Sequence, residues 1–388
     1  MPHFVTRMEV NLDNIADNFK SISRYVSPAA VIPVLKGNAY GHGAVAVARV
    51  LVEAGATHMA VAKLDEAKEL VSAGVDTGKV DILIMTVTLP DEIKEAAELG
   101  ISMFIPDLPR LQYVKSLARR SSRPVGFHIK VDTGMGRLGF MPDEAPQVAE
   151  ELRDLGSARL IGIGSHLGAS WVETGHSKNQ WERFRHFVSV VDPSPEVLVH
   201  LAASGGTVRL PYTHMGAVRT GGLTYGLNRI PESPMELKPA LAYKTTVGQI
   251  KTLPPGWQIG YGTEREVKSP MKTATVPAGA LDGVAPWMAG RAHFLVNGVR
   301  CRLLTSSMDA SIIDIGQAGD VKVGDEVVII GTQGRFTITG RELIIEASNT
   351  GFGTHLGHIS TRIPRIYYKN GEYAGMASWI AREGIAAM

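Results

Sequence analysis

The sequence has little that would place it in a membrane, on a nucleic acid or in an oxidising compartment. Its single cysteine, Cys301, excludes a disulfide within the chain. No segment approaches the roughly eighteen uninterrupted apolar residues of a membrane span, and the N-terminus carries Arg7 and Glu9 rather than a long apolar stretch. The net charge is +2 and no run of basic residues occurs, so we expect neither nucleic acid nor membrane as a partner. These absences predict a cytoplasmic protein.

The first part of the chain alternates apolar strand-like segments with helical ones. At 388 residues the chain is long enough for two domains. A first helix is predicted at 11–25, and later helices at 64–73, 90–99, 108–118, 143–155 and 179–191. The predicted strands lie at 29–35, 57–62, 80–87, 101–105, 125–131, 160–164, 196–200 and 213–218. Eight strands alternating with helices indicate an α/β fold, a (β/α)8 barrel.

An open, doubly wound sheet is the alternative to the barrel. It would place a phosphate-binding glycine fingerprint after the first strand, and the residues following Leu35 do not match one. Beyond residue 236 the pattern changes to short strands, predicted at 243–251, 272–276, 293–296, 311–315, 326–330 and 336–339, with Asn-Gly turns at Asn297 and Asn370. We therefore predict a barrel domain over 1–236 and a mainly-β domain over 237–388.

The stretch Val31-Ile-Pro-Val-Leu-Lys-Gly-Asn-Ala-Tyr-Gly-His-Gly43 places a lysine at the end of a buried strand. Lys36 is badly placed for packing, because an ammonium group there must be paired, desolvated or used covalently. A lysine whose stem packs while its charge reaches water is the plain alternative. Tyr40, four residues later on a glycine-rich loop, favours a lysine that binds an aldehyde cofactor, with the cofactor phosphate nearby.

Further polar and glycine clusters follow the other predicted strands. In a barrel these positions all face one rim, where active sites lie. The loops after the last two strands frequently bind phosphate through backbone N–H groups. The clusters are Lys130–Arg137, Ser165-His166, Ser204-Gly-Gly206 and Arg219-Thr-Gly-Gly222.

Three side chains have both a functional and a plain explanation. Arg137 stands in a glycine-rich turn, and its guanidinium suits a phenolate or a carboxylate. A lone histidine such as His166 is more often structural, and no second ligand stands at metal spacing, so we predict no metal site. Tyr261, between two glycines, either fills a sheet edge or acts as a base. The ordinary pKa of a phenol is ~10, so a base at this position requires surroundings that assist its deprotonation.

Together these motifs resemble the alanine racemase family, the fold-type III pyridoxal-phosphate enzymes, over nearly the whole chain. The resemblance rests on long motifs in the right order. They are Lys36-Gly-Asn-Ala-Tyr-Gly-His-Gly43, Lys130-Val-Asp-Thr-Gly-Met-Gly-Arg-Leu-Gly139, Gly221–Gly226 after Arg219, Gly260-Tyr-Gly262, Met308-Asp309 and Arg362-Ile-Pro-Arg365.

The resemblance implies an isomerase that interconverts L- and D-alanine with pyridoxal 5'-phosphate and two bases. Lys36 would bind the cofactor and exchange the α-proton on one face. Tyr261, contributed by the partner in a head-to-tail homodimer, would act on the other. His166 would link Tyr261 to Arg219, and Arg219 would face the pyridine nitrogen and so limit side reactions. Arg137 would hold the cofactor's phenolic oxygen and the substrate carboxylate.

The resemblance also implies the remaining binding residues. Lys130 would be carbamylated and would fix Arg137 in place. The cofactor-binding set would be Lys36, Tyr40, His166, Ser204, Arg219, Gly221 and Gly222. Tyr40, Ser204 and Gly221 would hold the phosphate, helped by the Gly222 backbone. The substrate-binding set would be Arg137, Met308, Asp309 and Thr361.

Four positions depart from the family's pattern. Thr361 stands where a tyrosine usually precedes the Arg-x-Pro-Arg signature, and Ala280 replaces the tyrosine of a Gly-Tyr-Ala-Asp-Gly segment. Thr305 occupies the position of an arginine that lines the substrate entry in the family, and Trp171 occupies the position of an acidic entry residue. Loss of the two tyrosine rings predicts that side chains larger or more polar than methyl are accepted, serine first.

Two other functions stay open. A fold-type III lyase or decarboxylase would need a metal pair, for which His355 and His358 are the candidates, or a catalytic cysteine in a different setting from Cys301. A non-catalytic cofactor-binding protein would have the barrel but no β domain or Tyr261.

Overall fold

The computed structural model describes residues 4–172, 174–227, 230, 233–261, 265–343, 356 and 359–378. They form two compact units. The barrel unit holds the described residues within Asn14–Ala39 and Ala44–Lys238; the β unit holds those within Met1–Asp13, Tyr40–Gly43 and Pro239–Met388. Within these ranges no helix is long and apolar enough to cross a membrane.

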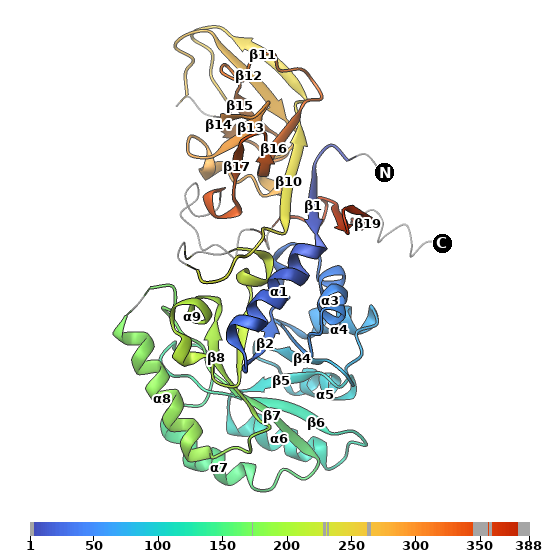
Figure 1. The fold of residues 1–388 in the computed structure, drawn as a ribbon, viewed down its shortest axis with the longest axis vertical. Coiled ribbons are helices and arrows are strands. Elements are labelled where there is room, and N and C mark those ends of the chain that lie inside the picture. Colours follow the sequence, from blue (N-terminus) through green and yellow to red (C-terminus); the bar gives the residue numbers. More distant parts are fainter. Residues whose placement is uncertain are drawn as a thin grey trace. The chain divides into compact units, whose positions relative to one another are not determined.

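Eight parallel strands form the centre of the barrel unit, in the order β2-β9-β8-β7-β6-β5-β4-β3 (Figure 1). A parallel bridge between Val34 and Ala60 joins the first strand to the last and nearly closes the sheet. The strand interiors are buried because both faces of such a sheet are covered. The strands are β2 Ala30–Pro33, β3 His58–Val61, β4 Asp81–Ile84, β5 Ser102–Ile105, β6 Val125–Lys130, β7 Ala158–Gly164, β8 Leu198–Ala203 and β9 Ala217–Thr220.

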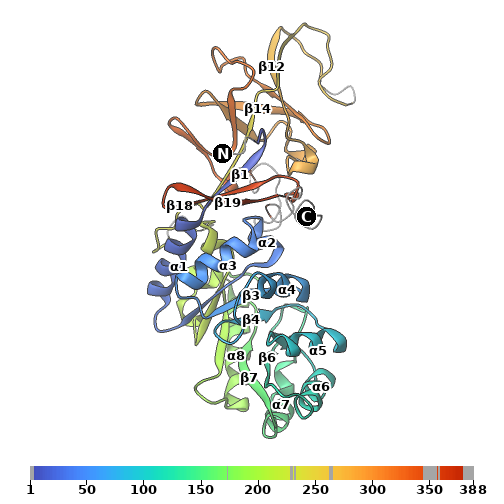
Figure 2. The ribbon, with the colours of Figure 1, turned by 90° about the vertical axis from the view of Figure 1, so that its right-hand side faces the viewer.

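Helices connect these strands and lie around them, as Figure 2 shows for α4 to α7. The connecting helices α4, α5 and α6 each bury apolar residues on one face; in α4 these are Leu64, Ala67 and Leu70. Asp107 begins α6 by accepting a hydrogen bond from the Arg110 N–H at 3.0 Å. The helices are α1 Leu12–Val26, α2 Lys36–Tyr40, α3 Ala44–Glu53, α4 Leu64–Ser72, α5 Pro90–Glu98, α6 Leu108–Ala118, α7 Ala145–Leu152, α8 Gly175–Val191 and α9 Ser204–Arg209.

The predicted barrel followed by a mainly-β domain is confirmed, although the last barrel strand was misplaced and the short elements α2 and α9 were not predicted. The strand predicted at 213–218 begins later, as β9 at Ala217. Pro211–Thr213 is instead a 3₁₀ turn, and Met215 has a left-handed φ of 50° that no strand tolerates. Arg219 therefore lies on the strand rather than after it.

The β unit is built on one long sheet in the order β11-β12-β15-β14-β13-β16-β10-β1-β18-β19, with β17 beside β16. Short 3₁₀ turns follow β12, including η4 Ala280–Asp282 and η5 Pro286–Met288. The strands are β1 Arg7–Asn11, β10 Leu241–Thr246, β11 Gln249–Leu253, β12 Met271–Val276, β13 His293–Val296, β14 Val299–Ser306, β15 Ser311–Asp314, β16 Glu326–Gln333, β17 Phe336–Ile338, β18 Arg365–Lys369 and β19 Glu372–Ala377.

Sequence patterns missed several strands of this unit. The strand predicted at 243–251 is two strands, β10 and β11, separated by Val247 and Gly248, whose N–H groups donate to the carbonyls of Asp325 and Thr275. Strands β1, β14, β18 and β19 were not predicted. The first of them joins the β unit although it begins the chain: β1 is antiparallel to β10 and parallel to β18. The domain limits of 1–236 and 237–388 stay a prediction.

Candidate active site

The predicted site residues of the barrel unit lie at or just beyond the carboxyl ends of its strands. Lys36 follows β2, Lys130 ends β6 and His166 follows β7. Ser204 directly follows β8, and Arg219 is on β9. Since parallel strands place these ends at one rim, residues far apart in the sequence meet there.

Lys36 begins α2, a short segment whose backbone is left-handed and not α-helical. The four residues after it have left-handed φ angles of 62°, 54°, 54° and 52°, three of them at non-glycine residues that pay a steric cost there. The Gly37 N–H donates to Glu66 at 2.6 Å, and the Asn38 side chain accepts from the Ala44 N–H at 2.7 Å. Burial and the charge of Arg137 lower the pKa of Lys36, against the opposing charge of Glu66. The turn thus presents an amine that loses its proton more readily than usual.

Asp132 organises the glycine-rich loop that carries Arg137. Its Oδ1 accepts the N–H groups of Gly134, Met135 and Gly136 at 2.9, 2.8 and 3.1 Å, and its Oδ2 accepts the Arg137 N–H at 2.7 Å. Burial acts to raise the pKa of Asp132, but these four donors outweigh it and the pKa is lowered. The carboxylate fixes the loop backbone and leaves the Arg137 side chain exposed.

Arg219 is buried, and its acceptors are carbonyl oxygens and imidazoles. Its Nη2 donates to the Ser165 carbonyl and to the Leu201 carbonyl at 3.2 Å, and lies 3.4 Å from His166 Nδ1. Its Nη1 donates to the His200 carbonyl at 3.0 Å and contacts the His200 ring. Burial and the charge of Arg137 lower the pKa of Arg219 to about 10, so it stays a cation at neutral pH. Buried cations of this kind need an anion close by.

The same charges act on Lys130 and His166. Burial, then Arg219, lowers the pKa of Lys130 to about 7 although Asp132 opposes this; its Nζ donates to the Val131 carbonyl at 2.7 Å. Burial, Arg219, Arg137 and the two lysines lower the pKa of His166 to about 3. His166 is therefore a neutral imidazole at neutral pH, within a site whose excess charge is positive.

Ser204 and Gly221 meet at the neighbouring strand ends. The buried Ser204 hydroxyl accepts the Gly221 N–H at 3.1 Å. A side chain at Gly222 would come within 3.1 Å of the Leu227 carbonyl, and one at Gly205 within 2.7 Å of Ser170 Oγ. The backbone in this corner is thus packed too closely for side chains. Tyr40 belongs to the β unit, and burial raises the pKa of its phenol to about 12.

In the β unit, Tyr261 and Met308 are exposed on neighbouring segments. Tyr261 is 90% exposed and Met308 67%, values far from those of core residues. A side chain at Gly260 would meet Thr305 at 2.6 Å, which places the Tyr261 turn against the end of β14. Met308 follows β14, and its carbonyl accepts the Leu281 N–H at 2.9 Å. Asp309 beside it is also exposed.

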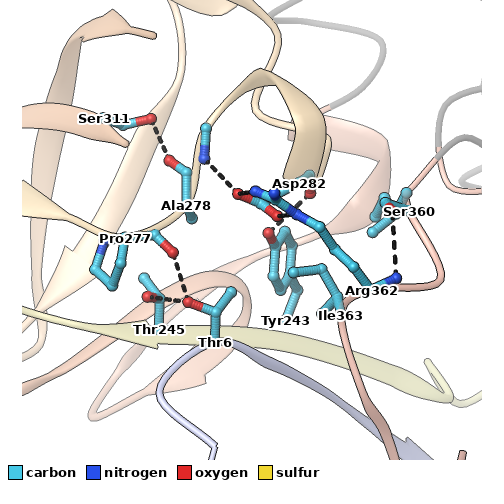
Figure 3. Close-up of polar contacts among 12 residues, drawn as sticks. Thr6, Tyr243, Thr245, Pro277, Ala278, Asp282, Ser311, Ser360, Arg362 and Ile363 are labelled. Atoms are coloured by element: carbon cyan, nitrogen blue, oxygen red, sulfur yellow. Dashed lines mark hydrogen bonds and ion pairs between the residues drawn. The ribbon is translucent and has the colours of Figure 1, made fainter. Parts of the chain in front are cut away.

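An ion pair between Asp282 and Arg362 joins the segments that carry Ala280 and Thr361, as Figure 3 shows. Arg362 donates Nε to Oδ1 at 2.7 Å and Nη2 to Oδ2 at 2.8 Å of the buried Asp282 carboxylate. The Gly279 N–H donates to the same carboxylate at 2.9 Å. This two-point contact holds the half-buried Ala280 and the exposed Thr361 in a defined relation.

Comparison with known proteins assigns both parts of the chain. Residues 10–229 match the family "Alanine racemase, N-terminal domain" and residues 240–367 match "Alanine racemase, C-terminal domain". The chain belongs to the alanine racemase family. It is 35% identical to alanine racemase 2 of Caldanaerobacter subterraneus over 97% of this chain and 98% of that one. Alanine racemase of Desulforamulus reducens is also 35% identical, over 92% of this chain and 98% of that one.

A solved alanine racemase has the same fold. The crystal structure of alanine racemase from Bacillus anthracis with bound L-Ala-P has a TM-score of 0.89 to this chain and 32% identity. The match covers 98% of this chain and all of that one. The predicted resemblance to the alanine racemase family is thus confirmed.

Several residues of the candidate site were given no role in the sequence-based predictions. Asp132 and Ser165 lie within motifs named above. Their side chains hydrogen-bond backbone groups, and the motifs do not indicate this role. His200 is a strand residue that contacts Arg219 from the barrel interior, and a histidine inside an apolar strand gives no signal of that. Asp282 was noted only as part of a changed segment. The predicted candidates His355 and His358 lie outside the described residues.

Proposed function

We propose that this chain interconverts L- and D-alanine. Family membership makes it an isomerase of the racemase type that uses pyridoxal 5'-phosphate. The observation that carries the proposal is the meeting, at one barrel rim, of the strained Lys36 turn with Arg137, His166 and Arg219.

The barrel rim suits a cofactor that carries a phosphate and a phenolic oxygen. The cations Lys36, Arg137 and Arg219 act on one another and on His166, and anions would relieve their mutual repulsion. The Ser204 hydroxyl and the close-packed backbone at Gly221 and Gly222 suit a phosphate. The phenol of Tyr40, which stays protonated because burial raises its pKa to about 12, is a further predicted phosphate ligand. Lys36 would attach the cofactor, Arg219 would face its ring nitrogen and Arg137 its phenolic oxygen.

Racemisation requires one group to take the α-proton and another to return a proton from the opposite side. The bound cofactor would supply an electron sink for the charge that develops at the α-carbon. Lys36, whose pKa is lowered, holds more of its amine neutral than an ordinary lysine and serves as base on one face. Tyr261 serves on the other face, and neutral His166 hydrogen-bonds the phenol. The Met308 N–H and Arg137 hold the substrate carboxylate beside Asp309 and Thr361.

The exposed side chains of the β unit fit a head-to-tail homodimer in which each subunit completes its partner's site. Tyr261, Met308, Trp287 and Leu281 are 90, 67, 57 and 48% exposed, and exposed apolar groups on neighbouring segments indicate an interaction surface. A phenol that is to act on a substrate needs a water-poor surrounding, which a partner subunit would provide. The homodimer and the cytoplasmic location stay predictions.

A lyase or decarboxylase fits less well. Cys301 is buried on β14, where burial raises the pKa of its thiol to about 12, so it is unsuited to catalysis. Among the residues that the structure describes, no three His, Cys, Asp or Glu side chains gather as a metal site would require; the candidate pair His355 and His358 lies outside those residues and stays a prediction. A non-catalytic cofactor carrier would have no use for Tyr261.

The function is tested by incubating purified, cofactor-loaded protein with single-enantiomer amino acids and separating the products by chiral chromatography. We expect L- and D-alanine each to give the racemate. Release of carbon dioxide or an aldehyde without inversion would establish the lyase alternative instead. Retention of cofactor with no turnover of any amino acid would establish the carrier.

We also propose that serine and larger side chains are accepted, because Thr361 and Ala280 each lack a ring at the edge of the substrate pocket. The double substitution Thr361→Tyr and Ala280→Tyr should then lower kcat/KM for serine by roughly 10- to 200-fold while alanine changes little. Steady-state kinetics on both substrates measure this, with Tyr373→Phe, an exposed position outside these segments, as control. A wild-type preference for alanine by orders of magnitude over serine would refute the wider specificity.

Carbamylation of Lys130 is expected to increase as the pH rises through about 7, the pKa to which burial and Arg219 lower this amine. Only the neutral amine attacks carbon dioxide; an N–C bond forms, a proton leaves, and the resulting anion lies near Arg137 and Arg219. Carbon-13 NMR with labelled bicarbonate would detect a carbamate signal that Lys130→Met removes. A signal that persists in Lys130→Met, or none at any pH, would contradict the assignment.

A further inference from the structure

A line of buried polar side chains leads from Arg219 through the barrel interior to Asp81. Arg219 Nη1 contacts Nδ1 of His200 on β8. Nε2 of His200 lies 3.0 Å from Nδ1 of His128 on β6, and Nε2 of His128 lies 3.4 Å from Oδ2 of Asp81, the first residue of β4. Both imidazoles are fully buried, so protein groups and not water determine which ring nitrogen carries the proton.

The groups at the two ends of this line determine the direction in which its hydrogen bonds are donated. Arginine can only donate hydrogen bonds and a carboxylate can only accept them. Burial acts to raise the pKa of Asp81, but the hydrogen bonds from His128 and Ser102 act against it and the pKa is lowered, which keeps Asp81 ionised. Burial and Arg219 lower the pKa of His200 well below its ordinary value, so that ring is neutral.

One proton arrangement satisfies every contact. His200 Nδ1 accepts from Arg219, and so its proton is on Nε2 and is donated to His128 Nδ1. His128 in turn has its proton on Nε2, facing Asp81. In the reverse arrangement His200 Nδ1–H would point at an Arg219 N–H, and the two donors would repel. The Phe104 ring stacks on His200 with 5.7 Å between the ring centroids and contacts His128 edge-on with 6.0 Å between the centroids, which keeps both imidazole planes in place.

We propose that Asp81 and His128 are positioning residues for Arg219. They hold His200 in the tautomer that accepts a hydrogen bond from the guanidinium, although Asp81 lies at the opposite end of its strand from the catalytic rim. This deepens the proposed function and rests on it for the placement of Arg219 at the cofactor ring. Neither residue touches substrate or cofactor.

The tautomer itself is measured by long-range proton–nitrogen NMR on protein labelled with ¹⁵N-histidine, the ring signals being assigned by single histidine substitutions. We expect wild-type His128 and His200 both to carry their proton on Nε2. A His200 protonated on Nδ1, or on both nitrogens, would overturn the proposal. This readout requires no turnover, so it decides the proposal even if the protein racemises nothing and the proposed function fails.

The positioning role is measured with matched variants of Asp81. Asp81→Leu removes the terminal acceptor and should allow His200 to reverse, whereas Asp81→Asn keeps an acceptor oxygen and should preserve the wild-type tautomer. We expect kcat/KM for alanine to fall about 10-fold in Asp81→Leu, with a shift in the absorption spectrum of the bound cofactor, and to stay within about threefold in Asp81→Asn. Asp154→Leu, at an exposed position, is the control.

His128→Phe interrupts the same series of hydrogen bonds at a second position and tests the proposal independently. It preserves the ring shape but leaves His200 Nε2 without an acceptor, and kcat/KM should fall by as much as about 100-fold. Activity within twofold of wild type and an unchanged cofactor spectrum in both Asp81→Leu and His128→Phe would overturn the proposal. Equal losses in Asp81→Leu and Asp81→Asn, with His200 unchanged by NMR, would also overturn it, because they would indicate a packing role.

Discussion

Replacing Lys36 with alanine is expected to abolish racemisation in both directions, by at least about 10³-fold. The Lys36 amine has two proposed tasks, attachment of the cofactor and exchange of the α-proton, and alanine can perform neither. Its lowered pKa and its strained turn after β2 prepare it for both. Chiral chromatography of reactions started from L- and D-alanine measures the loss.

The attachment point can be tested separately from activity. Borohydride reduction of the loaded wild-type protein, followed by peptide mapping, should place the cofactor on Lys36, and the Lys36→Ala variant should show no labelled peptide. Lys68→Ala, at an exposed lysine that pairs with Glu95, is the matched control and should keep both label and activity. A label on another lysine would show that the lysine at the end of β2 was misassigned.

Replacing Tyr261 with phenylalanine is expected to lower racemisation by about 10²- to 10⁴-fold while leaving one half of the reaction intact. Removal of the phenol takes away the proton donor on one face only. Lys36 should still exchange the α-proton of one enantiomer with solvent. Proton NMR in deuterium oxide would then show loss of the α-proton signal from that enantiomer without inversion. Exchange of both enantiomers at wild-type rates would exclude Tyr261 as a base.

The same two variants test whether the site is shared between subunits. In a dimer that pairs a Lys36→Ala chain with a Tyr261→Phe chain, one site has both defects and the other has neither. Random mixing after co-expression should therefore restore about a quarter of wild-type activity, because half of the dimers contain one intact site of two. Mixing Lys36→Ala with the double variant is the control and should restore nothing. No recovery in the first mixture would mean that each chain completes its own site.

The barrel could be predicted from the sequence because its strands are short, nearly continuous apolar runs. All eight overlap a predicted strand. The ends of β8 and β9 lie beyond the predicted ones, and the displacement is largest for β9, where the polar residues Arg219 and Thr220 belong to the strand. Polar side chains inside a barrel strand are tolerated when carbonyls and imidazoles satisfy them, as happens to Arg219. That compensation comes from other strands and leaves no trace in the local pattern.

The candidate site divides in the same way. Lys36, Arg137 and His166 could be named as candidates from the sequence because functional residues tend to lie in loops after strands and because glycines indicate tight turns. Asp132 and His200 act by holding other groups, Asp132 through four backbone N–H groups and His200 through the Arg219 side chain. Contacts of this kind depend on distances between strands. Only the folded chain provides them.

The pairing of β1 with both β10 and β18 has a consequence for synthesis. Arg7 is opposite Lys244, and Met8 is opposite Arg365, so β1 has no neighbour until β10 (Leu241–Thr246) has been made and gains its second only with β18 (Arg365–Lys369). The barrel residues between them can collapse during translation, since domains fold as they emerge. Until β10 has been made, both edges of β1 have unpaired N–H and C=O groups, and one edge stays unpaired until β18 follows. Chaperones shield such segments, and other chains can pair with them.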